Sequence, residues 1–347
     1  MKQRLLLILC LALLLAGCAA NSPEAAPEPK TAAEAPAPTP EPTPEPAGYT
    51  AAESAAMGSY MCANRWLIDG DALYGLDYDE DLRPVLAAWR LTEDGLRFER
   101  ILCADCVPAY LTTDGARLYY LNKGCLERLT LRTRKRETLH DGPLRSLQLC
   151  EGALYLTDGE GRFLRTDPDG KNPETLLEGP CGYAWVMPEG ILYQSEDEGC
   201  CLRLRLWDGE DRRLTAAASY APLRIDSTLW YAQKDREGSV LASVDLTDGT
   251  VTRYETPELR GTAELLRENG GWALRVFLAG DGWHQMILRP GETEGAACAY
   301  SGYRLCDGMS ETLRVDAAYD PDGRLRCFVL ADAAGGELRF FGGEPTE

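Results

Sequence analysis

An internal repeat constrains the fold of this 347-residue chain more than any other feature. The stretches EGALYLTDGEGRFLRTDPDGKNPETLLEGP (151–180) and EGILYQSEDEGCCLRLRLWDGEDRRLTAA (189–217) share one order of elements. Each reads as a turn, an apolar strand, an acidic turn, an alternating strand, an Asp-Gly turn and a short strand. The same frame fits 114–143 and 226–257, and looser copies occupy 69–101, 270–300 and 311–341. Together these stretches make seven copies of one β-rich unit.

Prolines mark where one unit passes to the next. They stand at Pro108, Pro143, Pro180, Pro222 and Pro257. A short apolar strand follows, as at 144–150 and 182–187, which brings each unit to four strands. A lone four-stranded sheet with two apolar faces buries both only by packing radially against its neighbours. The sequence therefore predicts an all-β protein in which residues 59–343 form a β-propeller of seven four-stranded blades, with six blades as the alternative.

The second to fifth units, about residues 107–257, resemble the propellers of the low-density-lipoprotein-receptor (YWTD) type found in bacterial surface lipoproteins. Asp167-Pro-Asp-Gly170 and Leu229-Trp-Tyr231 carry the likeness best. A true Tyr-Trp-Thr-Asp is absent, and the nearest stretch is Tyr155-Leu-Thr-Asp158. The resemblance implies the architecture and an exported binding role, and it transfers no site.

The first seventeen residues read as an export signal. Lys2 and Arg4 precede an apolar run, Leu5 to Leu15, that is shorter than the ~20 residues a membrane span needs. Leu15-Ala16-Gly17-Cys18 resembles the lipobox of bacterial lipoproteins. That resemblance implies cleavage before Cys18, a diacylglycerol on its thiol and a further acyl chain such as palmitate. The predicted location is the extracytoplasmic face of the cell membrane, held by a lipid anchor on Cys18.

Residues 18–58 are predicted to form a disordered tether between this anchor and the propeller. Nine prolines with scattered Glu and Ala occupy the stretch, and large apolar residues are almost lacking. Such a composition buries too little surface to fold and favours extended polyproline II. The expected role of the tether is that of a stalk.

The formal net charge is −19, and it becomes −21 once the two cations of residues 1–17 are removed. A strongly acidic chain argues against binding nucleic acid or docking on anionic lipid. No nucleic-acid partner is therefore expected.

No catalytic residue, metal ligand or cofactor is predicted. His140 and His284 lie in different units, and no nucleophile, zinc or phosphate-binding motif occurs. Asp77-Tyr-Asp-Glu-Asp81 begins like a calcium loop, but Leu82 and Ala88 stand where an EF-hand requires Gly and Glu, so a solvated acidic turn is favoured. The protein is accordingly expected not to be an enzyme.

Eleven cysteines follow Cys18, and the close pairs are Cys103-Ala-Asp-Cys106 and Cys200-Cys201. A single C-x-x-C is weak support for zinc. Free or buried thiols and one or two disulfides both remain open at this point.

A ligand-binding face is expected where the loops leaving the fourth strands meet the loops between second and third strands. Its candidate residues are Tyr110, Tyr183, Trp185, Tyr220, Tyr300 and Tyr303, beside acidic turns at 77–81, 158–160, 196–198, 235–237 and 281. Aromatic rings beside carboxylates suit an extracellular protein or a glycan. The predicted function is that of a surface binding module; the alternatives are a carbohydrate-active enzyme using acids at the channel and a spacer or assembly protein of the cell envelope.

Overall fold

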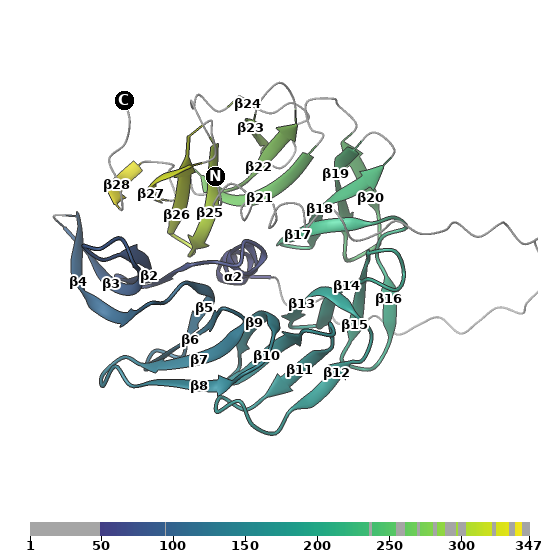
Figure 1. Ribbon diagram of the computed structural model, residues 1–347. Coiled ribbons are helices and arrows are strands. Elements are labelled where there is room, and N and C mark those ends of the chain that lie inside the picture. Colours follow the sequence, from purple (N-terminus) through teal and green to yellow (C-terminus); the bar gives the residue numbers. More distant parts are fainter. Residues whose placement is uncertain are drawn as a thin grey trace, which may run out of the picture. The chain divides into compact units, whose positions relative to one another are not determined.

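Seven four-stranded antiparallel sheets follow one another along the chain of this computed structural model, and they stand around a common axis (Figure 1). The structure describes residues 49–341 except 94, 236–237, 255–260, 269–270, 280–282, 289–295, 298–302, 321–323 and 333–336. All described residues belong to one compact unit, Gly48–Glu347. The predicted all-β propeller and its seven blades are thus confirmed.

Each blade is a meander of four consecutive strands, with its first strand nearest the axis (Figure 1). Blades 1 to 4 comprise β1 (Trp66–Asp69), β2 (Ala72–Tyr78), β3 (Pro84–Thr92) and β4 (Gly95–Ala104); β5 (Pro108–Thr113), β6 (Arg117–Asn122), β7 (Cys125–Thr130) and β8 (Arg136–His140); β9 (Leu144–Cys150), β10 (Ala153–Asp158), β11 (Phe163–Thr166) and β12 (Glu174–Leu177); and β13 (Cys181–Met187), β14 (Gly190–Ser195), β15 (Cys201–Leu206) and β16 (Asp211–Arg213). Blades 5 to 7 comprise β17 (Ser219–Ile225), β18 (Thr228–Asp235), β19 (Gly238–Asp245) and β20 (Val251–Tyr254); β21 (Gly261–Glu268), β22 (Gly271–Ala279), β23 (Trp283–Leu288) and β24 (Ala296–Ala297); and β25 (Tyr303–Met309), β26 (Leu313–Tyr319), β27 (Leu325–Asp332) and β28 (Glu337–Phe341).

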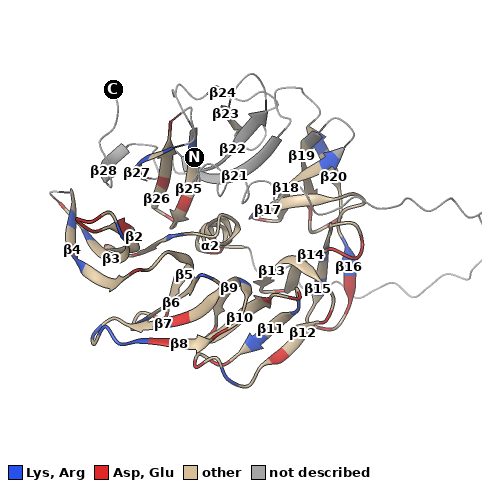
Figure 2. Ribbon diagram, in the orientation of Figure 1, with Lys and Arg blue, Asp and Glu red and all other residues tan. Residues whose placement is uncertain are grey.

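The core is divided among the seams between blades. The seam between blades 2 and 3, for example, joins Tyr119 and Leu126 to Leu147 and Leu154. Because both faces of a blade are covered in this way, side chains on both faces are apolar; β10 is buried at all six positions. Charged residues of both signs lie mostly on the outer strands and turns (Figure 2).

The first and last blades meet through side-chain packing, and neither contributes a strand to the sheet of the other. Trp66 of blade 1 lies in one apolar cluster with Val315 and Phe328 of blade 7, and its ring is 5.5 Å from that of Phe328. Gly75 of β2 makes room for Trp66, since a Cβ at this position would come within 2.2 Å of the indole. The last seam is therefore built like the others.

A recurrent turn explains why the Asp-rich stretches connect strands so regularly. In the β10–β11 turn the Asp158 carboxylate accepts the backbone N–H of Arg162 at 2.9 Å, and Gly161 takes a φ of +83°. The turns that begin at Asp79, Asp167 and Asp320 repeat the bond to the backbone N–H four residues on. An aspartate that caps its own turn fixes the hairpin locally.

Proline marks the entry of a blade in three of the predicted cases. Pro108 opens β5, while Pro143 and Pro180 directly precede β9 and β13. Pro222 instead lies inside β17, where the register shifts between Tyr220 and Leu223. Such a bulge tolerates a residue without an N–H. Pro257 lies outside the described residues.

One helix, α2 (Ala51–Met61), lies at the centre of the ring and is seen almost end-on in Figure 1. It corrects the predicted tether boundary, because residues 51–58 were expected to be disordered and are helical. Thr50 and Glu53 form a reciprocal capping box that starts the helix. Residues 1–48, which include the predicted signal, Cys18 and most of the tether, lie outside the described residues. Within the described part of the chain, no helix has the length and apolar character that a membrane crossing requires.

Candidate functional site

The aromatic residues predicted to form a binding face lie on the innermost strands rather than on the loops. Tyr110 is in β5, Tyr183 and Trp185 are in β13, and Tyr220 is in β17. Tyr303 begins β25, but its side chain and all of Tyr300 lie outside the described residues. Tyr110 and Trp185 pack on the ring of Tyr60, and the Tyr183 hydroxyl donates to the Ser219 carbonyl of the next blade. The role of these residues in binding stays a prediction.

Helix α2 occupies the place that an axial ligand would need. Tyr60 is 5% exposed, and its hydroxyl donates to the carbonyl of Ala184 at 2.7 Å. Its ring lies 4.8 Å from that of Trp185 and 5.3 Å from that of Tyr110. Two of the predicted ligand-binding residues thus pack against the protein's own helix.

The first turn of α2 is fixed by Tyr49, just before the helix. The indole N–H of Trp185 donates to the Tyr49 hydroxyl at 3.1 Å, and the Arg224 guanidinium lies 4.1 Å from the Tyr49 ring centroid. Arg224 is also paired with Glu189. Burial raises the pKa of the Tyr49 phenol, so this hydroxyl stays protonated.

The end of α2 is fixed to a different blade. Ser59 donates from its hydroxyl to the Met309 carbonyl at 3.0 Å and accepts the Met309 N–H at 2.9 Å. Asn64 then donates to the carbonyls of Trp66 and Leu111, both at 2.9 Å. With contacts to β5, β13, β17 and β25, α2 acts as a stopper of the channel.

Carboxylates near the axis are paired with arginines. Asp307 is 2.8 Å from Arg65, and Asp316 lies 2.9 Å from Arg275 and 3.0 Å from Arg314. Burial would raise the pKa of Asp316, but the two guanidiniums outweigh it and lower that pKa. Carboxylates held ionised in this way suit structural ion pairs better than a general acid, which needs a raised pKa.

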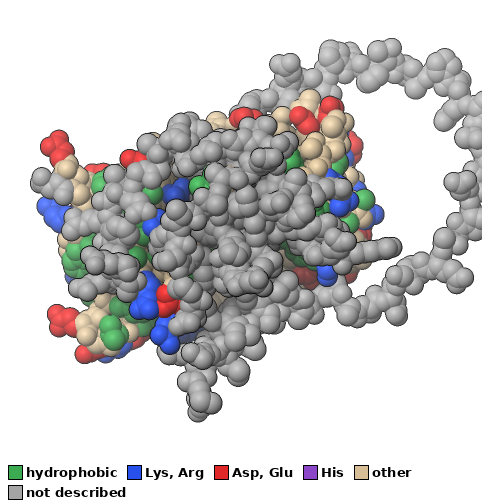
Figure 3. Space-filling view, turned by 90° about the horizontal axis from the view of Figure 1, so that it is seen from above, with side chains coloured by type: hydrophobic (Ala, Val, Ile, Leu, Met, Phe, Trp, Pro, Cys, Tyr) green, Lys and Arg blue, Asp and Glu red, His purple; other side chains and the backbone are tan. Residues whose placement is uncertain are grey.

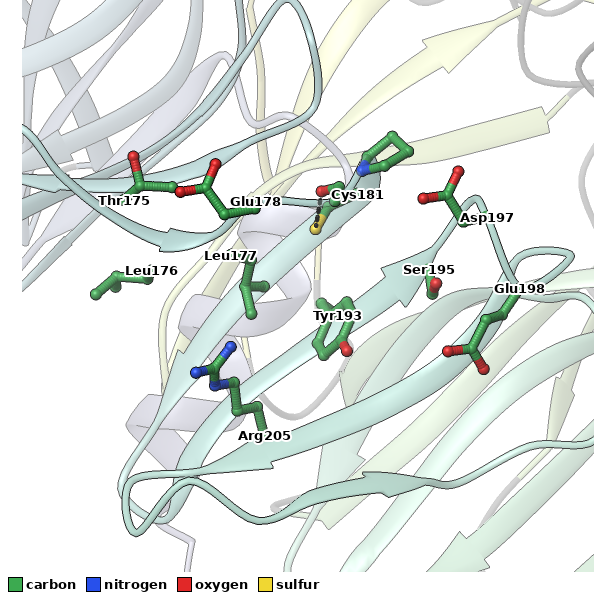
Figure 4. Close-up of a pocket in the computed structure, with 12 residues that line it drawn as sticks. Thr175, Leu176, Leu177, Glu178, Cys181, Tyr193, Ser195, Asp197, Glu198 and Arg205 are labelled. Atoms are coloured by element: carbon green, nitrogen blue, oxygen red, sulfur yellow. Dashed lines mark hydrogen bonds between the residues drawn. The ribbon is translucent and has the colours of Figure 1, made fainter.

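A groove lies between blades 3 and 4, and its volume is about 480 Å³. We define this groove by Thr175–Cys181, Tyr193, Ser195, Asp197, Glu198 and Arg205. Figure 4 shows Tyr193 and Leu177 in its middle, Asp197 and Glu198 at one end and Arg205 at the other. The sequence analysis found only the acidic turn 196–198, because the groove forms where two units meet.

Polar contacts hold the walls of the groove in place. The Tyr193 hydroxyl donates to Asp211 at 2.7 Å, which leaves the ring as a fixed apolar wall. Arg203 donates to both oxygens of Glu198 at 2.7 Å and to Asp211 at 2.9 Å. Burial raises the pKa of Cys181 to about 12, so this thiol is not an anion at neutral pH.

Two carboxylates that line the groove lie outside the ion pairs described above. Asp197 and Glu178 are exposed, and no residue in the described part of the chain forms an ion pair with either of them. On the face seen in Figure 3, some acidic side chains adjoin basic ones and others stand apart from them. The groove therefore carries two carboxylates outside ion pairs, Asp197 at one end and Glu178 on the other side of Cys181 (Figure 4).

The acidic turns predicted around the face are largely neutralised. Arg83 bonds Asp79 at 3.1 Å and Asp81 at 2.7 Å, and Arg162 lies 2.7 Å from Asp158. Asp79 also accepts two backbone N–H groups of its own turn. Among the described residues no group of His, Cys, Asp or Glu is arranged to hold a metal ion. The 77–81 stretch is thus a capped turn, while 235–237 and 281 carry no described side chains.

Comparison with known proteins supports the fold. No protein-family profile matches the sequence, and no curated protein matches it. Among solved structures, a puromycin-hydrolyzing peptidase of Mycobacterium tuberculosis matches with a TM-score of 0.59 at 15% identity, covering 82% of this chain and 55% of that chain. A puromycin hydrolase matches with a TM-score of 0.57 at 17% identity, covering 88% and 56%.

These matches correct one expectation. The sequence predicted a protein that is not an enzyme, yet the similar structures belong to a peptidase and a hydrolase, so the lack of a catalytic motif does not exclude an activity. This chain spans little more than half of those chains. At such low identity the likeness shows the propeller fold, which commonly serves as an interaction module.

Proposed function

We propose that this protein is a lipid-anchored, extracytoplasmic binding protein whose groove between blades 3 and 4 takes up a basic segment of another protein. The lipobox-like Leu15-Ala16-Gly17-Cys18 and the proline-rich stretch after it support the anchor and the stalk. The likeness of the repeats to YWTD propellers of surface lipoproteins supports the same location.

The single observation that carries the choice of ligand is the pair of uncompensated carboxylates, Asp197 and Glu178. A Lys or Arg side chain beside Asp197 gains a charge-assisted hydrogen bond, and its stem packs on Tyr193; Glu178 adds negative charge on the other side of Cys181. Arg205 at the far end would meet a carbonyl or carboxylate of the same segment. The net charge of −19 adds long-range attraction for a cationic partner.

Because helix α2 blocks the axis, we expect a ligand to bind on the faces of the ring or at the seams between blades. Because α2 fills the axis and packs on Trp185 and Tyr110, a ligand cannot reach these two predicted residues from the axis without displacing the helix. The groove, in contrast, is open while α2 is in place. This contrast favours a binding segment at a blade seam.

The test uses the soluble domain, residues 49–347, so that α2 is retained. Short Lys-containing peptides are titrated against it and compared with the same peptides carrying Glu in place of Lys. We expect Asp197→Asn to weaken binding about fivefold, as the loss of roughly 1 kcal/mol implies, and Glu80→Gln, on a turn of blade 1, to leave it unchanged. Raised salt should weaken binding in parallel.

Two results would contradict the proposal. One is equal affinity for the Lys and Glu peptides. The other is selective retention of uncharged glycans with no effect of Asp197→Asn, which would favour a glycan-binding role.

A further inference from the structure

Cys103 and Cys106 form a dithiol at the seam between blades 1 and 2. Cys103 is the next-to-last residue of β4 and is half-buried, whereas Cys106 is fully buried in the apolar cluster of that seam. Asp105 between them has a φ of +51°, and the Cys106 N–H donates to the Pro84 carbonyl at 3.1 Å. This tight turn brings both side chains to one seam, where Cys103 packs on the apolar cluster that contains Cys106.

A cation is fixed beside the outer sulfur. Arg136 of β8 donates from its guanidinium to Cys103 Sγ at 3.0 Å. Arg136 is itself held by Glu127, whose two carboxylate oxygens accept at 2.6 and 2.5 Å. The sulfur of Cys103 is thus presented to solvent with a positive charge on one side and a second thiol on the other.

The inner side of the dithiol holds a polar group that has no hydrogen-bond partner. Tyr120 is fully buried in the same seam as Cys106, and its hydroxyl is unpaired. Cys103 packs on the same cluster, so Tyr120 and both thiols share this seam. A buried hydroxyl without a partner is costly, and here it leaves one hydrogen-bonding group available in the seam that holds the dithiol.

We propose that Cys103 and Cys106 form a thiol–disulfide exchange site on the rim of the propeller. The Cys103 thiolate attacks one sulfur of an incoming disulfide, forming a mixed disulfide and releasing the other half as a thiolate. The Cys106 sulfur then attacks Cys103 Sγ, its proton passes to the departing thiolate, and a Cys103–Cys106 disulfide forms. One disulfide is reduced to two thiols while the protein dithiol is oxidised, and the reverse reaction oxidises an incoming dithiol.

The division of roles follows from the two environments. The hydrogen bond from Cys106 and the charge of Arg136 lower the pKa of Cys103 to about 6, although burial opposes this. The bond to Cys103 and burial raise the pKa of Cys106. Cys103 is therefore the attacking thiolate that meets the substrate, and Cys106 is the resolving thiol. The substrate class is a disulfide, carried by an exported protein or by a small thiol compound.

Trapping tests the proposal in the soluble domain, residues 49–347. Cys106→Ala is expected to retain a mixed disulfide at Cys103, seen by mass on the tryptic peptide 101–117, whereas Cys103→Ala should trap nothing at Cys106. Two arms, oxidised glutathione and a disulfide-linked peptide pair, distinguish the two sources of substrate. Half-buried Cys125, whose pKa is raised by its hydrogen bond to Asp141, is the internal control.

The rate of attack on dithiodipyridine at pH 6 is the second measurement. An ordinary thiol with a pKa of about 8.5 is far less ionised, so even after the loss of nucleophilicity Cys103 should react about tenfold faster. Arg136→Gln should remove much of this advantage, and Arg136→Lys should keep part of it.

Three outcomes would overturn the proposal. The first is that neither disulfide forms an adduct with Cys106→Ala. The second is that Cys103 reacts no faster than Cys125 at pH 6. The third is that the wild-type disulfide stays closed in excess reduced glutathione, which would identify a structural bridge instead of an exchange site.

Discussion

Replacing Tyr60 tests whether α2 is part of the folded core. The ring of Tyr60 is almost completely buried between Trp185 and Tyr110, and its hydroxyl bonds the Ala184 carbonyl at 2.7 Å. Tyr60→Phe keeps the ring and removes the hydrogen bond, which should lower the free energy of unfolding by about 1–2 kcal/mol. Tyr60→Ala also opens a cavity at the axis and should cost about 3–5 kcal/mol.

Urea unfolding of residues 49–347, followed by tryptophan fluorescence, measures both effects because Trp185 contacts the mutated side chain. At a slope of about 3 kcal/mol per molar urea, Tyr60→Ala should lower the midpoint by roughly 1 M or more. The matched control is Ala56→Gln, an exposed position of the same helix. Equal midpoints for Tyr60→Ala and Ala56→Gln would refute the reasoning, since α2 would then contribute nothing to the core.

Four further predictions concern other parts of the chain. Starting the soluble chain at residue 62, which removes α2, should lower the unfolding midpoint more than any single substitution in the helix; an unchanged midpoint would contradict this. Burial raises the pKa of Tyr60 above the unfolded value of about 10, so its contribution to stability should be complete below pH 10 and fall as the pH rises beyond it, as unfolding at pH 8 and pH 11 would show. Asp316→Asn should cost about 3–5 kcal/mol because its buried ion pairs with Arg275 and Arg314 are lost, and since the pKa of Asp316 is lowered, the wild-type contribution should be lost as the pH falls below about 4. Cys18→Ala should shift the protein from the membrane to the soluble fraction of cells, and retention in the membrane would contradict a lipid anchor.

Local patterns made the blades predictable. Alternating strands and Asp-Gly turns recur within each unit, and turns capped by their own aspartate, such as those at Asp158 and Asp167, need no distant partner to form. The seams then follow from the need to cover both faces of each sheet. For these reasons the number of blades could be read from one sequence.

The central helix was missed because its residues are small. Ala55, Ser54 and Gly58 are buried at the axis, where little space is left between the inner strands, yet the same residues resemble a tether in composition. A signal was present in Thr50-Ala-Ala-Glu53, which has the form of a capping box. Where an Ala-rich stretch follows such a box, helix propensity outweighs the lack of large apolar side chains.

The groove and the dithiol depended on contacts between units. The sequence pointed to Cys103 and Cys106 by their spacing, but Arg136 and Tyr120, which set their chemistry, come from strands of the next blade. Likewise, the sequence gives no reason to single out Asp197 among many acidic residues. In the structure Glu196 and Glu198 form ion pairs with Arg145 and Arg203, whereas Asp197 forms none with a described residue. Which of these residues form a site is decided by contacts between blades, and no local sequence pattern predicts those contacts.

The position of α2 also has a mechanical consequence. Whatever precedes Tyr49 is joined to the ring through this helix, so a pull on the N-terminal side loads the helix before it loads any strand. The load is shared among the Tyr60–Ala184 and Ser59–Met309 hydrogen bonds and the packing on several blades at once. A strand at the edge of a sheet would instead give way one bond after another. In the proposed lipid-anchored protein, α2 would therefore resist a force applied at the N-terminal side. The rate at which the helix is extracted, rather than the equilibrium stability of the ring, would set how long the fold withstands that force.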